Sequence, residues 1–252
     1  MSLAREGLHG KIALVTGGSR GIGAATCRAL AAAGARVVVN YRESKDAAAD
    51  LADEIGGIEI MADVADHDQV QAMVDQVLAD LGGLDILVNN AGIAHDSLIY
   101  DMRPGDWSRV MATNFGGVFN ATSAVLPHFM ARGAGVIVNV SSVMGERGWI
   151  GQANYAASKG AINAFTRACA METARFGIRV NAVLPGFCPT DLVGALPEKD
   201  IHKQIPMRAL ADPEQVASVI RFLAGPGAGY VTGSLVTVDG GAMTALGLGR
   251  AR

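Results

Sequence analysis

The strongest constraint on this chain is a repeated alternation of short β-branched apolar runs with longer alanine-rich or amphipathic segments. Runs of this length are typical of strands, and the intervening segments have the length and pattern of helices. The run Val37-Val38-Val39 is apolar throughout, as is typical of strands that helices cover on both faces. The alternation predicts a doubly wound α/β domain.

The predicted strands are Lys11–Val15, Arg36–Asn40, Ile58–Ala62, Asp85–Val88, Val136–Val140, Arg179–Leu184 and Leu235–Val238. The predicted helices lie near Gly21–Ala33, Ser44–Glu54, Asp66–Leu81, Asp106–Ala131, Ala153–Phe176 and Pro213–Leu223. Gly34, Gly82, Gly133 and Gly177 are expected to end four of them. The segment Phe187–Leu210 is a long, proline-containing irregular connection, which favours a substrate-binding loop over residues 187–210.

Length and charge bound the class of protein. A chain of 252 residues, half of them apolar, can form one domain over residues 1–252. The net charge of −3 and the lack of basic runs argue against nucleic-acid binding. A polar N-terminus and no apolar stretch of about 18 residues argue against a secretory signal and a membrane span, so a cytoplasmic location is expected. Three scattered cysteines argue against a disulfide framework and against a metal site.

A glycine-rich turn follows the first strand, over Gly17, Gly18, Gly21 and Gly23. A dinucleotide fold places its pyrophosphate at this point, because glycine lets backbone amides and a helix N-terminus approach the anion. The spacing G-x-x-x-G-x-G differs from the commoner fingerprint. Taken alone, the turn is equally consistent with a tight strand-to-helix connection that needs positive φ.

Further polar motifs stand at or just beyond the ends of later strands, where ligands bind in open α/β sheets. They are Asn89-Asn90-Ala91-Gly92, Asn114, Ser141-Ser142 and Pro185-Gly186.

A phenol and an ammonium share one face of the predicted helix Ala153–Phe176, at Tyr155 and Lys159. A phenol titrates near ~10, and a cation about 4 Å away would stabilise its phenolate by roughly 4 kcal/mol at an effective dielectric of about 20. We therefore expect the pKa of Tyr155 to approach neutrality. Such pairs also occur by chance on exposed helices.

In these motifs and their order, the chain resembles the short-chain dehydrogenase/reductase family in its short form, from about Lys11 to Gly241. Three motifs look like those of the 3-oxoacyl-(acyl-carrier-protein) reductase branch of fatty acid biosynthesis. They are Asn139-Val140-Ser141-Ser142, Gln152-Ala153-Asn154-Tyr155 and Pro185-Gly186-Phe187. The resemblance implies a Rossmann-like fold with a seven-stranded parallel sheet and helices on both faces.

The resemblance also implies catalytic roles. Tyr155 would donate a proton to a carbonyl oxygen as hydride arrives from a nicotinamide, and Ser142 would hydrogen-bond the same oxygen. Lys159 would lower the pKa of the tyrosine and bind the nicotinamide ribose, and Asn114 would hold a water linked to Lys159. A serine-hydrolase interpretation is rejected, because no nucleophile elbow and base are present.

The cofactor is expected to be NADP(H). The second strand ends in Asn40-Tyr41-Arg42 and not in the carboxylate that an NAD-specific site uses, while Arg42 and Arg20 could approach a 2′-phosphate. Both arginines could instead be ordinary solvated charges. Asp63-Val64 resembles the family's adenine contact, although an N-cap near Asp66 is the structural alternative.

The predicted cofactor-binding set also includes Gly17, Ser19, Arg20, Gly21, Ile22, Asn90, Ala91, Gly92, Tyr155, Lys159, Pro185, Gly186 and Thr190. Cys188 is expected near the cofactor without reactive thiol chemistry. Met144, Trp149, Ile150, Leu192 and Met207 are candidates for an apolar substrate pocket, or for core or interface.

The resemblance to the 3-oxoacyl reductase branch implies a 3-oxoacyl thioester as the substrate, possibly on acyl carrier protein. Such carrier-protein reductases present basic residues beside the cleft. The corresponding neighbourhoods here hold one arginine each, Arg132 and Arg175. A free small-molecule ketone is the alternative substrate, and a non-catalytic dinucleotide sensor is a weaker one. The resemblance further implies a homotetramer that pairs the helices Asp106–Ala131 and Ala153–Phe176 and uses Thr232–Gly241 in a second interface.

Overall fold

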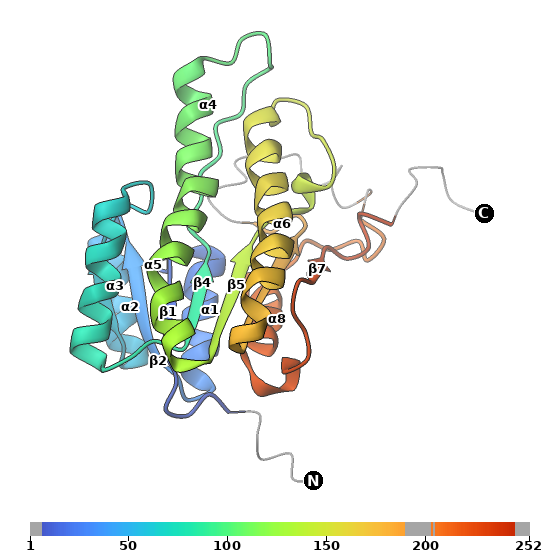
Figure 1. Cartoon of the computed structure of the whole chain (residues 1–252). Coiled ribbons are helices and arrows are strands. Elements are labelled where there is room, and N and C mark those ends of the chain that lie inside the picture. Colours follow the sequence, from blue (N-terminus) through green and yellow to red (C-terminus); the bar gives the residue numbers. More distant parts are fainter. Residues whose placement is uncertain (1–6, 190–202, 204, 245–252) are drawn as a thin grey trace.

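The computed structural model describes residues 7–189, 203 and 205–244. Seven parallel strands form one sheet in the order β3-β2-β1-β4-β5-β6-β7 (Figure 1). They are β1 (Ile12–Val15), β2 (Arg36–Tyr41), β3 (Ile58–Met61), β4 (Ile86–Asn89), β5 (Gly135–Val140), β6 (Ile178–Pro185) and β7 (Leu235–Val238). The strand order reverses between β1 and β4, which is where a doubly wound sheet opens a crevice beyond its carboxyl ends. The predicted fold class is confirmed.

The α-helices of the described residues are α1 (Gly21–Ala32), α2 (Lys45–Ile55), α3 (His67–Leu81), α4 (Pro104–Met111), α5 (Gly117–Arg132), α6 (Ala153–Thr173) and α8 (Pro213–Ala224). One core layer joins α1, α2 and α8 to the sheet, around Cys27, Leu30, Val39 and Ile220. A second joins α3, α5 and α6 to the opposite face, around Leu14, Met73, Phe129 and Ile137. The central strand β1 is apolar and almost fully buried because both faces of the sheet are covered there.

Local signals explain where several helices begin and end. The Asp66 carboxylate accepts hydrogen bonds from the backbone amides of Asp68 and Gln69 and so caps α3. Gly82 and Gly133 end α3 and α5 with left-handed backbone, at φ +75° and +64°. These endings agree with the sequence prediction.

The predicted helix Asp106–Ala131 is three consecutive pieces. It begins earlier, at Pro104, because proline suits the first helical turn, where no backbone donor is needed. A π-helical turn, η2 (Ala112–Gly116), then separates α4 from α5. Such turns are often found at functional sites, and this one carries Asn114. The Asn114 side chain makes tertiary bonds from this turn, and no local pattern in the sequence predicts the turn.

Candidate active site

The glycine-rich turn between β1 and α1 is packed closely on the segment that follows β4. Gly17 and Gly21 have left-handed backbone, at φ +59° and +53°. A Cβ on Gly23 would lie 2.2 Å from the carbonyl oxygen of Gly17, and a Cβ on Gly17 would lie 2.9 Å from Cα of Ala91. No side chain fits at Gly17 or Gly23, so the turn presents bare backbone at a helix N-terminus, as an anion site requires. Ser19, Arg20 and Ile22 belong to the same turn.

Asn90 and Thr16 hold this turn in place. The Thr16 hydroxyl accepts hydrogen bonds from the backbone amides of Asn90 and Ala91, at 2.9 and 3.1 Å. The Asn90 side-chain amide donates to the carbonyl oxygens of Thr16 and Gly17, both at 2.9 Å. The side chain of Asn90 is therefore a brace for the glycine-rich turn, and its predicted cofactor contact remains a prediction for its backbone.

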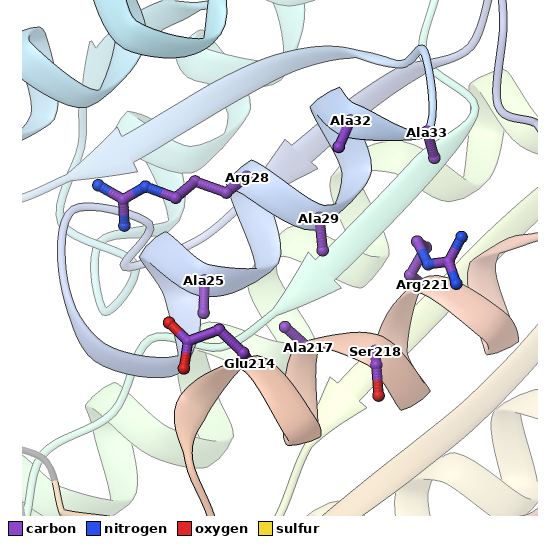
Figure 2. A pocket seen from close by; sticks show the side chains of 9 residues that line it. All are labelled: Ala25, Arg28, Ala29, Ala32, Ala33, Glu214, Ala217, Ser218 and Arg221. Carbon is purple, nitrogen blue, oxygen red and sulfur yellow. The ribbon is translucent and has the colours of Figure 1, made fainter.

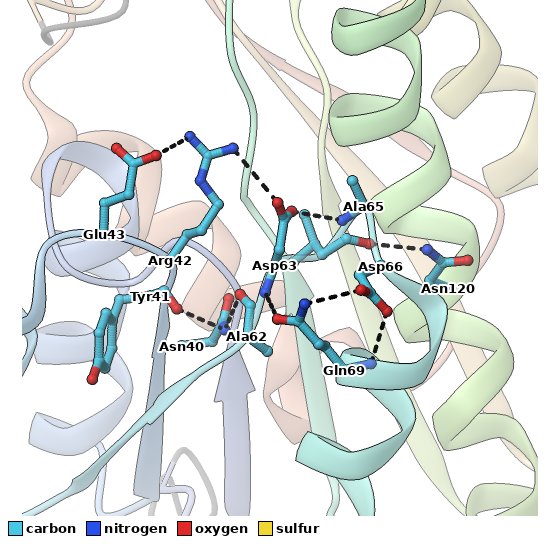
Figure 3. Close-up of polar contacts among 11 residues, drawn as sticks. Asn40, Tyr41, Arg42, Glu43, Ala62, Asp63, Ala65, Asp66, Gln69 and Asn120 are labelled. Carbon is cyan, nitrogen blue, oxygen red and sulfur yellow. Dashed lines mark hydrogen bonds and ion pairs between the residues drawn. The ribbon is translucent and has the colours of Figure 1, made fainter.

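Asn40 and Tyr41, at the end of β2, both face the protein interior. Asn40 is buried; its Oδ1 accepts from the Gly17 amide at 3.2 Å, and its Nδ2 donates to the Ala62 carbonyl oxygen at 3.1 Å. Tyr41 lies in the core layer of α1 and α2 and points away from Arg42 (Figure 3). Neither side chain is a carboxylate, and both are committed to packing, so a cofactor contact remains a prediction for their backbone atoms.

Arg42 lies half-exposed beside the end of β3. Its guanidinium forms an ion pair with Glu43 and lies 3.7 Å from Oδ2 of Asp63, so it stands between two carboxylates (Figure 3). Asp63 also accepts from the Ala65 amide at 2.9 Å. Asp66, and not Asp63, supplies the N-cap of α3, which leaves Asp63 at the carboxyl edge of the sheet.

Tyr155 lies in the first turns of α6 with little exposure to solvent. Burial raises the pKa of its hydroxyl to about 12, a hydrogen bond with Ser142 opposes this, and the charge of Asp96 adds to it. The expectation of a pKa near neutrality is wrong for this structure, because burial is the largest influence on the Tyr155 hydroxyl. At neutral pH the hydroxyl is protonated and can donate.

Lys159 lies one turn along α6 and is buried, with its ammonium 5.5 Å from the centre of the Tyr155 ring. Its Nζ donates to the carbonyl oxygen of Val140 at 2.9 Å. Burial lowers the pKa of Lys159 to about 8. The Ser141 hydroxyl donates to the Lys159 carbonyl oxygen at 3.1 Å, which attaches the end of β5 to the helix.

Asn114 is fully buried and joins the segment after β4 to α6. Its Oδ1 accepts from the Ile93 amide at 2.8 Å, and its Nδ2 donates to the Ile93 carbonyl oxygen at 3.0 Å and the Ser158 hydroxyl at 3.1 Å. A Cβ placed on Gly92 would lie 3.3 Å from Asn114 Oδ1 and 3.7 Å from Lys159 Nζ. Asn114, Gly92 and Lys159 thus lie close together, and the water expected between Asn114 and Lys159 remains a prediction.

The sequence comparisons agree with this geometry. The family model described as short chain dehydrogenase matches residues 11–201. The chain belongs to the short chain dehydrogenase family. The predicted resemblance is confirmed.

Three relatives show how far this similarity extends. An acetoacetyl-CoA reductase of Shinella zoogloeoides is 44% identical over 235 residues, which cover 92% of this chain and 98% of the relative. A 3-oxoacyl-(acyl-carrier-protein) reductase of Synechocystis sp. is 45% identical over 240 residues, which cover 93% of this chain and 97% of the relative. Among solved structures, a gluconate 5-dehydrogenase from Burkholderia cenocepacia in complex with NADP and tartrate has a TM-score of 0.92 and 38% identity, covering 96% and 98%.

The end of β6 lies at the carboxyl edge of the parallel sheet, as does the glycine-rich turn after β1. The Gly186 amide donates to the Val238 carbonyl oxygen at 2.9 Å, and a Cβ on Gly186 would lie 2.8 Å from Cα of Asp239. Pro185 is the last residue of β6. Thr190, also predicted to bind the cofactor, lies outside the described residues.

The residues predicted to line an apolar substrate pocket differ in their exposure and in their contacts. Trp149 packs edge-on against Phe187, with ring centres 5.5 Å apart, while Ile150 and Met207 are largely exposed. Met144 packs on a small buried cluster, and Leu192 lies outside the described residues. Cys188 is buried, and burial raises the pKa of its thiol to about 11, so it is protonated at neutral pH.

Arg132 and Arg175 lie away from Tyr155 in the structure. Arg132, at the end of α5, donates to Asp85 at 3.0 Å just before β4 begins, and Arg175 stacks on Phe176 just before β6. Both lie at the edge where strands start, and Tyr155 lies at the opposite edge. Within one chain these two arginines therefore do not stand beside the cleft, because helices antiparallel to the strands end at the far edge of the sheet.

A shallow groove runs between α1 and α8, with an alanine floor and Arg28, Glu214, Ser218 and Arg221 along its sides (Figure 2). These helices cover the sheet face opposite α6, so the groove is separate from Tyr155. Among the described residues, no helix has the length and hydropathy of a membrane span, and no three His, Cys, Asp or Glu side chains gather as a metal site.

The sequence analysis misses three side chains that position the site. Asn154, fully buried, accepts from the Tyr155 amide at 2.7 Å, and the Ser158 hydroxyl donates to the Tyr155 carbonyl oxygen at 2.7 Å. Asp96 acts through its charge. Asn154 and Ser158 directly precede Tyr155 and Lys159 in the sequence, and this proximity could have identified them. No sequence pattern connects Asp96 with Tyr155.

Proposed function

We propose that this chain is an NADPH-dependent oxidoreductase that reduces the ketone of a 3-oxoacyl thioester to a secondary alcohol. The observation that carries the proposal is the buried group of Tyr155, Ser142 and Lys159 at the carboxyl edge of the sheet, next to the glycine-rich turn. Its relatives include an acetoacetyl-CoA reductase and a 3-oxoacyl-(acyl-carrier-protein) reductase, which supports a thioester substrate.

The reaction needs one hydride and one proton, and the bound nicotinamide supplies the hydride. Tyr155 supplies the proton, because its hydroxyl remains protonated at neutral pH and an alkoxide is far more basic. Ser142, which hydrogen-bonds that hydroxyl, orients the substrate oxygen toward it. Lys159 lies against the Tyr155 ring and stabilises the phenolate that remains after proton transfer.

Two features of the chain support NADPH as the cofactor, one at the pyrophosphate and one at the ribose 2′-phosphate. The side-chain-free turn at Gly17, Gly21 and Gly23 suits a pyrophosphate. The end of β2 offers an amide and a core phenol where an NAD site would offer a carboxylate to the ribose. We infer that Arg42 binds the 2′-phosphate of NADPH by exchanging its contacts with Glu43 and Asp63.

The second candidate is reduction of a free small-molecule ketone. The placement of Arg132 and Arg175 favours it, because neither stands beside Tyr155 to meet an acidic carrier protein. A carrier-bound substrate would therefore need basic groups from elsewhere, such as a second subunit.

Loss of NADPH absorbance with acetoacetyl-CoA, a carrier-bound 3-oxoacyl group and simple ketones tests the proposal. We expect turnover of thioesters above that of ketones, a preference for NADPH over NADH, and a loss of about 10²- to 10⁴-fold in kcat/KM for Tyr155→Phe. The matched control is Tyr230→Phe, since Tyr230 is fully exposed. Equal turnover by wild type and Tyr155→Phe would contradict the catalytic assignment.

We also propose a homotetramer. Its support in this chain is the apolar surface of α5 and α6, where Phe119, Met130 and Met171 are exposed.

A further inference from the structure

A short segment after β4, residues His95 to Ser97, is fastened to the start of α6. The Gln152 side-chain amide donates to both carboxylate oxygens of Asp96, at 3.2 and 3.1 Å. The Ser97 amide donates to the Gly151 carbonyl oxygen at 2.8 Å. These bonds join two segments distant in sequence directly in front of the turn that carries Tyr155.

A buried asparagine continues the connection to the tyrosine. Asn154 donates from Nδ2 to the His95 carbonyl oxygen at 3.0 Å and accepts at Oδ1 from the Tyr155 amide at 2.7 Å. Because Asn154 is fully buried and both ends of its amide are bonded, it connects the backbone of His95 to that of Tyr155.

The charges around Tyr155 come from three elements. Lys159 lies on its own helix, and Asp96 lies on the segment after β4. Asp106, at the start of α4, pairs with Arg103 at 2.7 Å and Arg109 at 3.5 Å and lies 3.3 Å from His95 Nε2, so its charge is compensated. Asp96 has the Gln152 amide as its partner instead, with no ion pair to another described residue, and its charge raises the pKa of Tyr155.

We propose that Asp96 is a positioning residue for the reaction under "Proposed function": held by Gln152, its carboxylate fixes the start of α6 and keeps a negative charge near the Tyr155 hydroxyl. This charge disfavours the phenolate and so extends to higher pH the range in which Tyr155 carries its proton. Since Asp96 is on the surface, the effect is screened by salt.

The variant Asp96→Asn separates the charge from the contact, because its amide oxygen can still accept from Gln152. With NADPH and the best ketone, we expect the alkaline limb of kcat/KM to move to lower pH by about half a unit, and by less at high salt. We expect Asp96→Glu to keep the wild-type midpoint. A role in folding alone would lower kcat at every pH and leave the midpoint in place.

A titration without substrate keeps this inference separate from the proposed function. Near-ultraviolet phenolate absorbance, corrected with the Tyr155→Phe protein, should rise at lower pH in Asp96→Asn than in wild type, even if no tested ketone is reduced. The matched control is Asp101→Asn, an exposed carboxylate a few residues further along the chain. An unchanged midpoint in both the rate profile and the titration, or an equal shift in Asp101→Asn, would overturn the proposal.

Discussion

At the scale of single residues, the site combines two buried ionisable side chains, Tyr155 and Lys159, of which the first is neutral and the second mostly charged at neutral pH. Burial keeps the Tyr155 hydroxyl protonated, so this side chain carries no buried charge at neutral pH. Lys159 is also buried but keeps most of its charge below its lowered pKa of about 8, with Val140 as its hydrogen-bond acceptor. The folded state therefore bears a desolvation penalty at Lys159, as is typical where function and stability conflict.

We predict that Lys159→Met abolishes turnover and stabilises the fold by about 1 to 3 kcal/mol at pH 7. Because the folded pKa of Lys159 is about 8 and its ordinary value is 10.5, folding of the wild type releases protons between these values. Wild-type stability should thus rise from pH 8 to 10.5, and the advantage of the variant should shrink over the same range. Urea unfolding at pH 7 and 10 measures this; a variant less stable than wild type at pH 7 would contradict it.

At the scale of elements, the placement of α6 depends on a buried polar ladder beneath the site. Asn89 and Asn139 are paired at the ends of β4 and β5, with Asn89 Nδ2 donating to Asn139 Oδ1 at 2.9 Å. Asn139 Nδ2 in turn donates to the hydroxyl of Thr166 on α6 at 2.9 Å. This ladder fixes the helix relative to the end of β5, from which Val140 and Ser142 reach Lys159 and Tyr155.

We predict that Thr166→Val destabilises the protein by about 1 to 3 kcal/mol, because the buried Asn139 amide loses its acceptor. Thr173→Val is the matched control on the same helix. The Thr173 hydroxyl donates to the Cys169 carbonyl oxygen at 2.7 Å and also hydrogen-bonds the Cys169 thiol, one turn earlier on the same helix. Thermal unfolding of both variants should show the larger loss in Thr166→Val; an equal loss would show that the ladder contributes nothing beyond the hydroxyl.

At the scale of the whole molecule, apolar side chains remain uncovered on α5 and α6, which cover the same face of the sheet (Figure 1). Met171 on α6 is 83% exposed and Phe119 on α5 is 51% exposed. Packing against a second copy would remove this surface from water, as the proposed homotetramer requires.

We predict that Met171→Glu reduces the assembly to a smaller species, because each interface would bury a charge. Met61→Glu is the control, since Met61 is 65% exposed on β3, at the opposite edge of the sheet from β7. Light scattering coupled to size exclusion measures both. A wild-type monomer, or a Met171→Glu protein of wild-type mass, would contradict the proposed interface.

The sequence by itself determined the order of strands and helices, most of their bounds and the positions of the residues in the predicted site. The alternating pattern, the glycines at 82 and 133, and the pair of Tyr155 and Lys159 act over one helical turn or one strand, so a local pattern is sufficient to predict them. Only the tertiary structure decided the protonation of Tyr155, the π-helical turn at Asn114 and the place of Arg132. These depend on burial, field and chain direction, which arise from residues far apart in sequence and therefore leave no local pattern.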